Sequence, residues 1–435
     1  LYNMALSGSS SNWVAGVVAD QIPGAIQLNA DQMLDNTNLI LTGSNSFTVT
    51  NLEANLDASG TSGSLTVNTS NIIDNAASLK AGTGNVVVNG GDATDTITVT
   101  GLSTNNQTFS AQSSTSNFNI TAGANDQTIS GSNTGSDTIA GGAGTDTLSY
   151  AGGSNVNVTI TSYGNQAGGS SGQGTDTFTG FESLVGATGN DTLRGTNSPT
   201  DEVATITGAN SGSLRDSGSS GTFNFSSFEQ IDLQGGNDTV LFNSNAASLA
   251  ANVDLGAGTG DTLSYGGYSN TVSVSLNDIT ANSGTTTSGG ATAIGGTASG
   301  FESLVGGSSS GDTLIDSTGD SSVSVTGANS GTIDGLTFSA FENLNLSTGN
   351  DTVTVNGSGS TVSLTGSLDL GDGTNSLTMN GSAGSIASVS SGTGDDTVSI
   401  SAGLVTGAVT AGNGTNSLTI SGTNSRVGSY TSGTG

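Results

Sequence analysis

Short runs of alternating polar and apolar residues recur along the chain. Examples are residues 96–99, 352–355, 397–400 and 417–420, and each run follows a cluster of Gly, Asn and Asp. A period of two is typical of a β-strand with one buried face, and these cluster residues are the ones that tight turns prefer. The pattern therefore predicts many short strands joined by tight turns. It also argues against disorder, because a disordered tract has no reason to keep this phase.

The turns repeat at a nearly constant spacing toward the C-terminus. Asp351, Asn375, Asp396 and Asn416 occupy equivalent turn positions and stand 24, 21 and 20 residues apart. A period near twenty is that of one coil of a solenoid, in which stacked coils bury a core that no single coil can bury. We therefore predict an all-β fold, a parallel β-solenoid of the β-helix or β-roll kind, with coils of about 18–24 residues. Asn alternates with Asp at these stacked positions, which lowers the negative charge of the stack. We therefore expect a hydrogen-bonded ladder of Asn and Asp side chains here in place of a metal site.

A second repeat places Glu directly after Phe. It occurs at Phe181, Phe228, Phe301 and Phe341, and an Asp follows each Glu after nine or ten residues. This spacing is half a coil, so each copy reads as strand, turn and strand. We expect the Phe residues in the core with Glu as an exposed or turn-facing neighbour. A metal-binding or polar-ladder role for the Glu is the alternative.

A larger duplication organises the middle of the chain. Three segments recur roughly 120 residues later along the chain, and they begin at Gly142, Gly180 and Thr207. We expect one continuous solenoid, in which differing insertions, at 164–174 and 281–299, form loops on one face. The expected organisation is a cap or intersubunit arm at 1–36, solenoid at 37–139, two duplicated blocks at 140–253 and 254–355, and regular coils at 356–435.

Composition narrows the function classes. The 435 residues include 4 Lys and Arg, 34 Asp and Glu, and neither His nor Cys, which gives a net charge of −30. Four basic residues cannot form a nucleic-acid-binding surface, and disulfides, Cys/His zinc sites and His- or Cys-based catalysis are excluded. No apolar run is long enough for a transmembrane helix, so we expect no membrane insertion. Only six of the acids are Glu, and the remaining Asp residues favour turns and calcium ligation.

The Gly-Asp turns carry the candidate chemistry. Residues 141–149 read GGAGTDTLS and match the calcium-binding nonapeptide GGxGxDx(apolar)x, and residues 132–140 keep its phase. Glycine permits a tight turn whose carbonyl groups face a cation, and Asp supplies a carboxylate. For single matches a plain turn competes with this interpretation. The candidate Ca²⁺ ligands are Gly135, Asp137, Gly141, Gly142, Gly144, Asp146, Asp176, Asp191, Asp238, Asp261, Asp312, Asp351 and Asp396.

These Gly-Asp turns, the GFESLVG-like strands and the scarcity of Lys resemble bacterial RTX and S-layer surface proteins over most of residues 80–420. The resemblance implies secretion to the bacterial cell surface, Ca²⁺-dependent folding there, and self-assembly. The chain departs from that pattern because only one pair of nonapeptides is in tandem and the coils are nearer 20 than 18 residues.

Three functions compete at this point. The first is a structural, extracellular surface-layer or filament subunit that assembles with itself and is stabilised by Ca²⁺. The second is an adhesin or biofilm-matrix rod, with cell-surface polysaccharide as a further partner. The third is a polysaccharide-active β-helix enzyme, which would depend on Lys80, Arg194, Arg215 or Arg426. We expect no enzyme, because aromatic platforms for sugars are scarce at 4%, and we read these basic residues as charge partners of nearby Asp.

Overall fold

The computed structural model describes residues 2–7, 12–16, 24–33, 37–52, 54–69, 77–90, 96–218, 221–278, 283–288, 291–356, 362–380 and 384–434. Across these residues the chain forms strands and turns with no helix, and most strand pairs are parallel. The prediction of an all-β parallel solenoid is confirmed. None of the described segments is a helix long and apolar enough to cross a membrane.

The chain divides into two compact units. Unit 1 comprises Leu1–Thr196 and Ser213–Glu229, and unit 2 comprises Asn197–Gly212 and Gln230–Gly435. The boundary between the units crosses strand β22 (Ser211–Asp216). Each unit contains two series of paired strands, here called sheet A and sheet B, and a typical coil contributes one strand to each.

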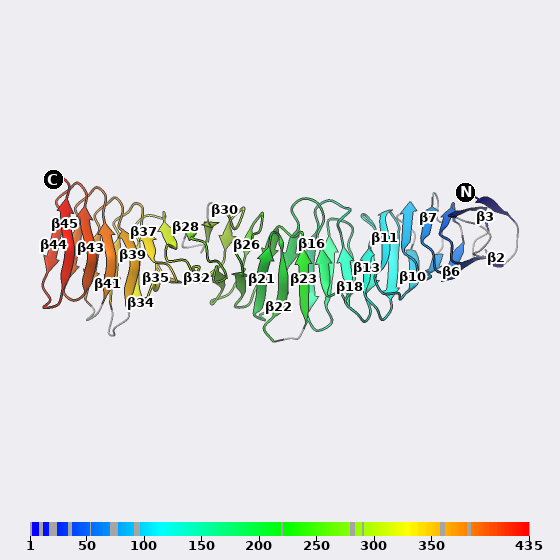
Figure 1. The fold of residues 1–435 in the computed structure, drawn as a ribbon, viewed down its shortest axis with the longest axis horizontal. Coiled ribbons are helices and arrows are strands. Elements are labelled where there is room, and N and C mark those ends of the chain that lie inside the picture. The colour runs from blue at the N-terminus through cyan, green and yellow to red at the C-terminus, as the bar shows by residue number, and fades with distance from the viewer. Residues whose placement is uncertain are drawn as a thin grey trace. The chain divides into compact units, whose positions relative to one another are not determined.

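In unit 1, strands of successive coils lie side by side along both sheets (Figure 1). Sheet A runs β1 (Tyr2–Ser7), β3 (Ile26–Gln32), β5 (Phe47–Thr50), β7 (Leu65–Thr69), β9 (Val86–Gly90), β11 (Gln107–Ser114), β13 (Gln127–Ser130), β15 (Thr147–Ser149), β19 (Ser183–Val185) and β23 (Thr222–Ser226). Sheet B contains β2 (Asn12–Gly16), β4 (Asn38–Gly43), β6 (Asn55–Thr61), β8 (Ala77–Lys80), β10 (Thr96–Leu102), β12 (Asn117–Ala122), β14 (Thr138–Ala140), β18 (Thr177–Thr179), β17 (Ala167–Ser171), β16 (Asn157–Ser162) and β20 (Thr192–Arg194).

Unit 2 has the same construction. Sheet A contains β21 (Glu202–Gly208), β25 (Thr239–Phe242), β27 (Thr262–Ser264), β32 (Ser303–Val305), β36 (Leu336–Ser339), β35 (Ser330–Ile333), β34 (Ser322–Gly327), β38 (Thr352–Val355), β40 (Ser376–Met379), β42 (Thr397–Ile400) and β44 (Ser417–Ile420). Sheet B contains β24 (Gln230–Asp232), β26 (Val253–Asp254), β31 (Ala298–Ser299), β30 (Ala291–Thr292), β29 (Ser283–Ser288), β28 (Val272–Asp278), β33 (Thr313–Asp316), β37 (Asn343–Asn345), β39 (Ser363–Asp369), β41 (Ser385–Ser390), β43 (Leu404–Ala411) and β45 (Arg426–Ser432).

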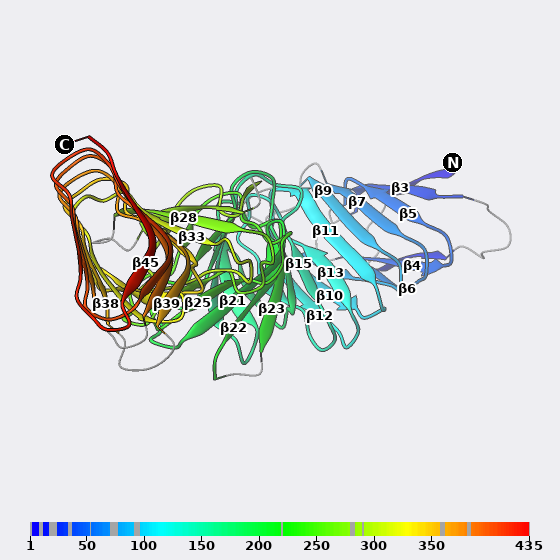
Figure 2. The same cartoon turned by 60° about the vertical axis from the view of Figure 1, so that its left-hand side comes forward.

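Alternation along each strand determines what is buried. In β38, Val353 and Val355 are fully buried while Thr352 and Thr354 face outward. The register pairs Thr352 with Ser376, then Thr397, then Ser417, which confirms the coil spacing that the turns predict. Figure 2 shows these C-terminal coils nearly end on, with successive coils lying over one another. Burial of equivalent apolar residues in adjacent coils forms the continuous core.

The two insertions differ from the loops expected of them. Within residues 164–174, β17 pairs antiparallel with β16. Within residues 281–299, β29 pairs antiparallel with β28. The expectation of loops was wrong for these strands, because each insertion folds into a hairpin that adds a strand to sheet B. Ala281 lies outside the described residues.

The first residues of the chain extend the ladders. Strand β1 pairs in parallel with β3, and β2 pairs in parallel with β4. These strands therefore continue both sheets of unit 1. Pro23 and residues 34–36, which belong to the same predicted cap or arm, lie outside the described residues.

Candidate functional site

The predicted Asp positions form a hydrogen-bonded ladder in sheet A of unit 2. Each lies directly before a strand or, for Glu202, at its first residue, and in register with the equivalent residue of the next coil. The first series is Glu202, Asp238, Asp261 and Glu302. The second series is Ser321, Asp351, Asn375, Asp396 and Asn416. Sequence reasoning identified the Asp residues, and the structure joins them with Glu, Ser and Asn in the same columns.

One side-chain oxygen of each ladder residue has a defined partner. Oδ1 of Asp261 accepts the backbone N–H of Asp238 at 2.6 Å, and Oε2 of Glu302 accepts the N–H of Asp261 at 2.9 Å. In the second series, Oδ1 of Asp396 accepts the N–H of Asn375 at 3.0 Å. The predicted Asn/Asp hydrogen-bonded ladder therefore exists. It satisfies a buried N–H group that the turn would otherwise leave without a partner.

The Asp and Asn residues of the ladder differ at the second polar atom of the side chain, which is Oδ2 in Asp and Nδ2 in Asn. Oδ2 has no hydrogen-bond donor within the described chain in five Asp residues that are each at most 2% exposed: Asp146, Asp238, Asp261, Asp351 and Asp396. Asp191 and Asp312 differ, because the backbone N–H groups of Ala187 and Gly307 also lower their pKa values. At Asn416 the corresponding Nδ2 donates to the carbonyls of Gly412 at 2.8 Å and Gly414 at 3.4 Å. Asn375 makes the same pair of bonds to its own turn. An ionised Asp cannot donate to these carbonyls, so its second oxygen needs a proton or a cation.

The acid-base properties of the ladder follow from this burial. Removal from water raises the pKa of Asp238 to about 7 and that of Asp261 to about 6, and neighbouring acids including Glu202 and Glu302 add to the increase. Burial also raises the pKa of Asp351 to about 6, with Asp316 contributing. Bonds from backbone N–H groups oppose these shifts. Crowded, buried carboxyl groups favour the neutral form or a bound cation.

Unit 1 has ladder contacts of the same kind in both of its sheets. In sheet A, Oδ1 of Asp146 accepts the N–H of Gln127 at 2.7 Å, and Glu182 accepts the N–H of Asp146 at 2.6 Å. In sheet B, Oδ1 of Asp176 accepts the N–H of Asp137 at 3.0 Å. The two Asp residues of the tandem nonapeptide thus lead into different sheets and join different columns, which matches one coil built from two half-coils.

The tandem residues also differ in how their carboxyl groups are satisfied. Both oxygens of Asp137 are bonded, because Oδ1 accepts the N–H of Phe118 at 2.8 Å and Oδ2 that of Ser132 at 2.6 Å. Burial, together with Asp176, still raises the pKa of Asp137 to about 7. Burial raises the pKa of Asp146 to about 6, and its Oδ2 has no donor in the described chain. Of this pair, only Asp146 has a carboxyl oxygen without a hydrogen-bond donor in the described chain.

Two further pairs repeat the motif in sheet B. Oδ1 of Asp191 accepts the N–H of Val156 at 2.6 Å, and Oδ1 of Asp312 accepts that of Val272 at 2.8 Å. The N–H groups of Asp191 and Asp312 donate in turn to Glu229 and Glu342, at 2.9 and 3.0 Å. Burial raises the pKa of Asp191, Asp176 and Asp312.

The Glu of the Phe-Glu repeat has the polar-ladder role, which is one part of the alternative given above. Phe181, Phe228, Phe301 and Phe341 are fully buried, as expected. The Glu residues that follow them, Glu182, Glu229, Glu302 and Glu342, each accept the N–H of a ladder Asp. Glu therefore replaces Asp as the acceptor in these coils. The spacing of nine or ten residues to the next Asp was the available signal, but the sequence does not show which coil the Glu contacts.

Glycine is required beside these carboxyl groups. Gly144 and Gly394 stand two residues before Asp146 and Asp396 and have φ of 144° and 132°, where side chains are strained. A Cβ at Gly141 would lie 2.0 Å from the Gly180 carbonyl oxygen. The remaining predicted glycines are equally confined, because a Cβ would lie 2.0 Å from a carbonyl oxygen at Gly142 and 2.3 Å from a hydroxyl at Gly135.

The donor set suits a hard cation such as Ca²⁺. A Cβ at Gly258 would lie 2.1 Å from the Gly236 carbonyl oxygen and 2.5 Å from Oδ2 of Asp261, so a carbonyl and an unpartnered carboxylate oxygen converge there. Oxygen atoms from carboxylates and carbonyls are the ligands that Ca²⁺ prefers. No cluster of three or more His, Cys, Asp or Glu side chains placed to hold a metal occurs in the described part of the chain. Backbone carbonyls would therefore have to supply part of any coordination shell.

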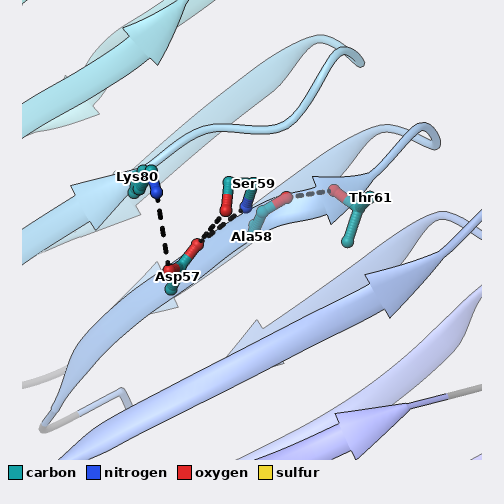
Figure 3. Close-up of polar contacts among 5 residues, drawn as sticks. All are labelled: Asp57, Ala58, Ser59, Thr61 and Lys80. Carbon is teal, nitrogen blue, oxygen red and sulfur yellow. Dashed lines mark hydrogen bonds and ion pairs between the residues drawn. The ribbon is translucent and has the colours of Figure 1, made fainter.

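One basic residue, Lys80, forms an ion pair with an Asp of the neighbouring coil. Nζ of Lys80 lies 3.8 Å from Oδ2 of Asp57, whose other oxygen accepts the N–H of Ser59 (Figure 3). This confirms the expected pairing of a basic residue with a nearby Asp. A pocket of ≈ 270 Å³ lies beside the pair, lined also by Asn38 and Ile40. Both partners are more than one-third exposed, so the ion pair contributes little to stability.

Comparison of the sequence with known proteins yields no matching family model and no matching curated protein.

Proposed function

We propose that this protein is an extracellular structural subunit that assembles with copies of itself and whose coils are held together by Ca²⁺. The observation that carries the proposal is the set of buried Asp Oδ2 atoms, which recur coil after coil without a donor in the described chain. A cation bound there would balance the charge of stacked carboxylates, which otherwise repel one another at about 5 Å between coils.

The ligands would come from the chain's own Gly-Asp turns. Asp146, Asp238, Asp261, Asp351 and Asp396 would contribute their second oxygens, and the adjacent turn carbonyls would complete the shell. The cation would supply a cross-link between the carboxylate and the turn. Modules with such ligands bind Ca²⁺ at roughly 10⁻⁴–10⁻³ M, a concentration range that suits an extracellular protein. The bacterial cell surface is therefore the proposed location.

The described strands of the two insertions bear on the adhesin alternative. Strands β17 and β29 pair antiparallel within sheet B. These strands therefore do not project as the loops that an adhesin would use.

Two measurements test the proposal. Circular dichroism melts with millimolar Ca²⁺ and with a chelator should show a large loss of stability on chelation, and an unchanged melt would refute the metal role. Electron micrographs of the purified protein in Ca²⁺ should show filaments or sheets. Persistent monomers at high concentration would contradict self-assembly and favour an adhesin or matrix rod that binds polysaccharide.

A further inference from the structure

A regular array of hydroxyl groups covers the outer face of five strands in sheet A of unit 2. Strands β34, β38, β40, β42 and β44 are parallel neighbours paired without a register shift. Each presents two outward side chains. One column is Ser322, Thr352, Ser376, Thr397 and Ser417, and the other is Ser324, Thr354, Thr378, Ser399 and Thr419.

The array repeats in two directions. Parallel strands lie about 4.8 Å apart, and two residues along a strand span about 6.6 Å. Ten hydroxyl groups therefore form a lattice two residues wide and five coils long. None of the ten hydroxyls has a hydrogen bond to another group of the described chain, and the residues that carry them are exposed or half-buried, so the hydroxyls remain available to a partner. Each hydroxyl can both donate and accept, as a water molecule does.

The other face of the same coils lacks this order. Sheet B has a register shift between β39 and β41, between β41 and β43, and between β43 and β45. It also places Asp369 and Arg426 among its strands. The array in sheet A has no charged residue in a chain of net charge −30. The contrast between the two faces indicates that the neutral lattice is a specific feature of one side.

The composition of the array restricts its partner. Protein interfaces are enriched in aromatic residues, Met and Arg, and none of these is among the ten side chains. Flat sugar rings are usually bound by aromatic rings, which are equally absent. A crystalline surface repeats by a fixed translation, so a surface that also repeats by fixed translations can contact it identically at every point. Ordered water presents such a lattice of donors and acceptors, and hydroxyl groups hold ordered water with little loss of hydrogen-bond strength.

We propose that the outer face of β34, β38, β40, β42 and β44 orders water and binds ice. The ten hydroxyl groups would form hydrogen bonds to water molecules of the ice surface. The methyl groups of Thr354 and Thr378 would exclude mobile water from the space between these hydroxyls. The array itself contains no ladder carboxyl group, so ice binding goes beyond the proposed assembly, although Asp351 and Asp396 directly precede β38 and β42.

The test is inhibition of ice recrystallisation and thermal hysteresis by the full chain in Ca²⁺. Thr378→Lys and Ser399→Lys, at the centre of the array, should abolish both activities, because one bulky charge interrupts the lattice. Thr378→Ser retains the hydroxyl but loses the methyl group, so it should reduce the activity without abolishing it. Thr410→Lys adds the same charge at an exposed position of β43 in sheet B and should leave the activity unchanged.

Circular dichroism melts of each variant separate loss of ice binding from loss of folding. Absence of both ice activities in the folded unsubstituted chain would overturn the proposal, as would full activity in the folded Thr378→Lys variant. Pull-down on crystalline cellulose provides a second arm. Cellulose binding that Thr378→Lys abolishes, in a chain without ice activity, would overturn the proposal in favour of a polysaccharide surface.

Discussion

The stretch from Glu202 to Glu302 and the stretch from Asp351 to Asn416 use one ladder geometry with different side chains. In both, an oxygen of one coil accepts the N–H of the preceding coil. In the first stretch every member is an acid, whereas in the second Asn375 and Asn416 alternate with Asp. The difference shows that the fold requires an acceptor at each coil, while the charge is a separate property added at some coils.

Asn and Asp differ in the second polar atom of the side chain, which is Nδ2 in Asn and Oδ2 in Asp. Their Nδ2 groups bond to two turn carbonyls, so these coils are satisfied by the chain alone. The Asp residues place an oxygen where Asn has a donor, and that oxygen has no donor in the described structure. We therefore expect the all-acid stretch to depend on cations or protons more strongly than the alternating stretch does.

Removal of calcium should have the largest effect. In a chelator at neutral pH, amide exchange should accelerate first in β21, β25 and β27, because three successive carboxyl groups there would lose the proposed Ca²⁺ counterion. Strands β40, β42 and β44 should retain more protection. Hydrogen-exchange mass spectrometry with and without Ca²⁺ measures both stretches in one sample, and equal protection in both would refute the comparison.

The pH dependence should have the next largest effect. The folded-state pKa values of about 6 to 7 for Asp238, Asp261 and Asp351 exceed the ordinary value of 3.8, so the folded chain holds these protons more tightly than the unfolded chain. Their contribution to stability is complete below about pH 4 and is lost as the pH rises through 6 to 7.

Urea denaturation in chelator should therefore give an unfolding free energy that falls between pH 4 and pH 7.5. Saturating Ca²⁺ should flatten this decrease, because the cation replaces the proton at neutral pH. A free energy that rises with pH in chelator would contradict the raised pKa values and the role assigned to the unpartnered oxygens.

Conversion of the alternating stretch into an all-acid one should destabilise it. Asn375→Asp removes two hydrogen bonds to the turn and places a third carboxyl group between Asp351 and Asp396. Loss of a buried donor costs about 1–3 kcal/mol. Urea denaturation at pH 7.5 in chelator measures the change, which should shrink at pH 5. Asn380→Asp adds the same charge at an exposed position of the same coil and should change stability little.

The reverse substitution should have a smaller effect of opposite sign. Asp238→Asn restores a donor beside the carbonyl of Gly236 and removes one charge from the crowded column. In chelator at pH 7.5 it should stabilise the chain by about 1 kcal/mol. It should also lower the number of bound Ca²⁺ ions measured by calorimetry. Asp395→Asn removes an equal charge from an exposed ladder and serves as the control; equal effects of the two variants would refute a role specific to the buried column.

The sequence predicted much of this site, but not all of it. The nearly constant spacing of Asp351, Asn375, Asp396 and Asn416 indicates that they stack, because a solenoid places residues one coil apart in register. The same spacing does not reveal that Glu182 or Glu302 reaches a ladder Asp. A Glu can replace Asp only where the backbone of its coil lies at a suitable distance, and that distance is a property of stacked coils.

The two insertions show a similar limit. Their Ser, Thr and Gly content is typical of loops, yet β17 and β29 form hairpins that pair within sheet B. Gly168 and Gly169 of β17 pair with Phe178 and Thr177 of β18, so the neighbouring strand organises residues of low strand propensity. Tertiary pairing thus overrides the local composition.

The sequence by itself determined the class of fold, the coil length and the turn positions of this protein. It did so because period-two alternation and glycine turns are local requirements of a strand and of a tight bend. Only the tertiary structure decided which oxygen of each Asp is satisfied, which Glu joins which column, and that two hydroxyl columns align on one face. These properties arise from contacts between coils, whose register depends on the packing of the whole stack.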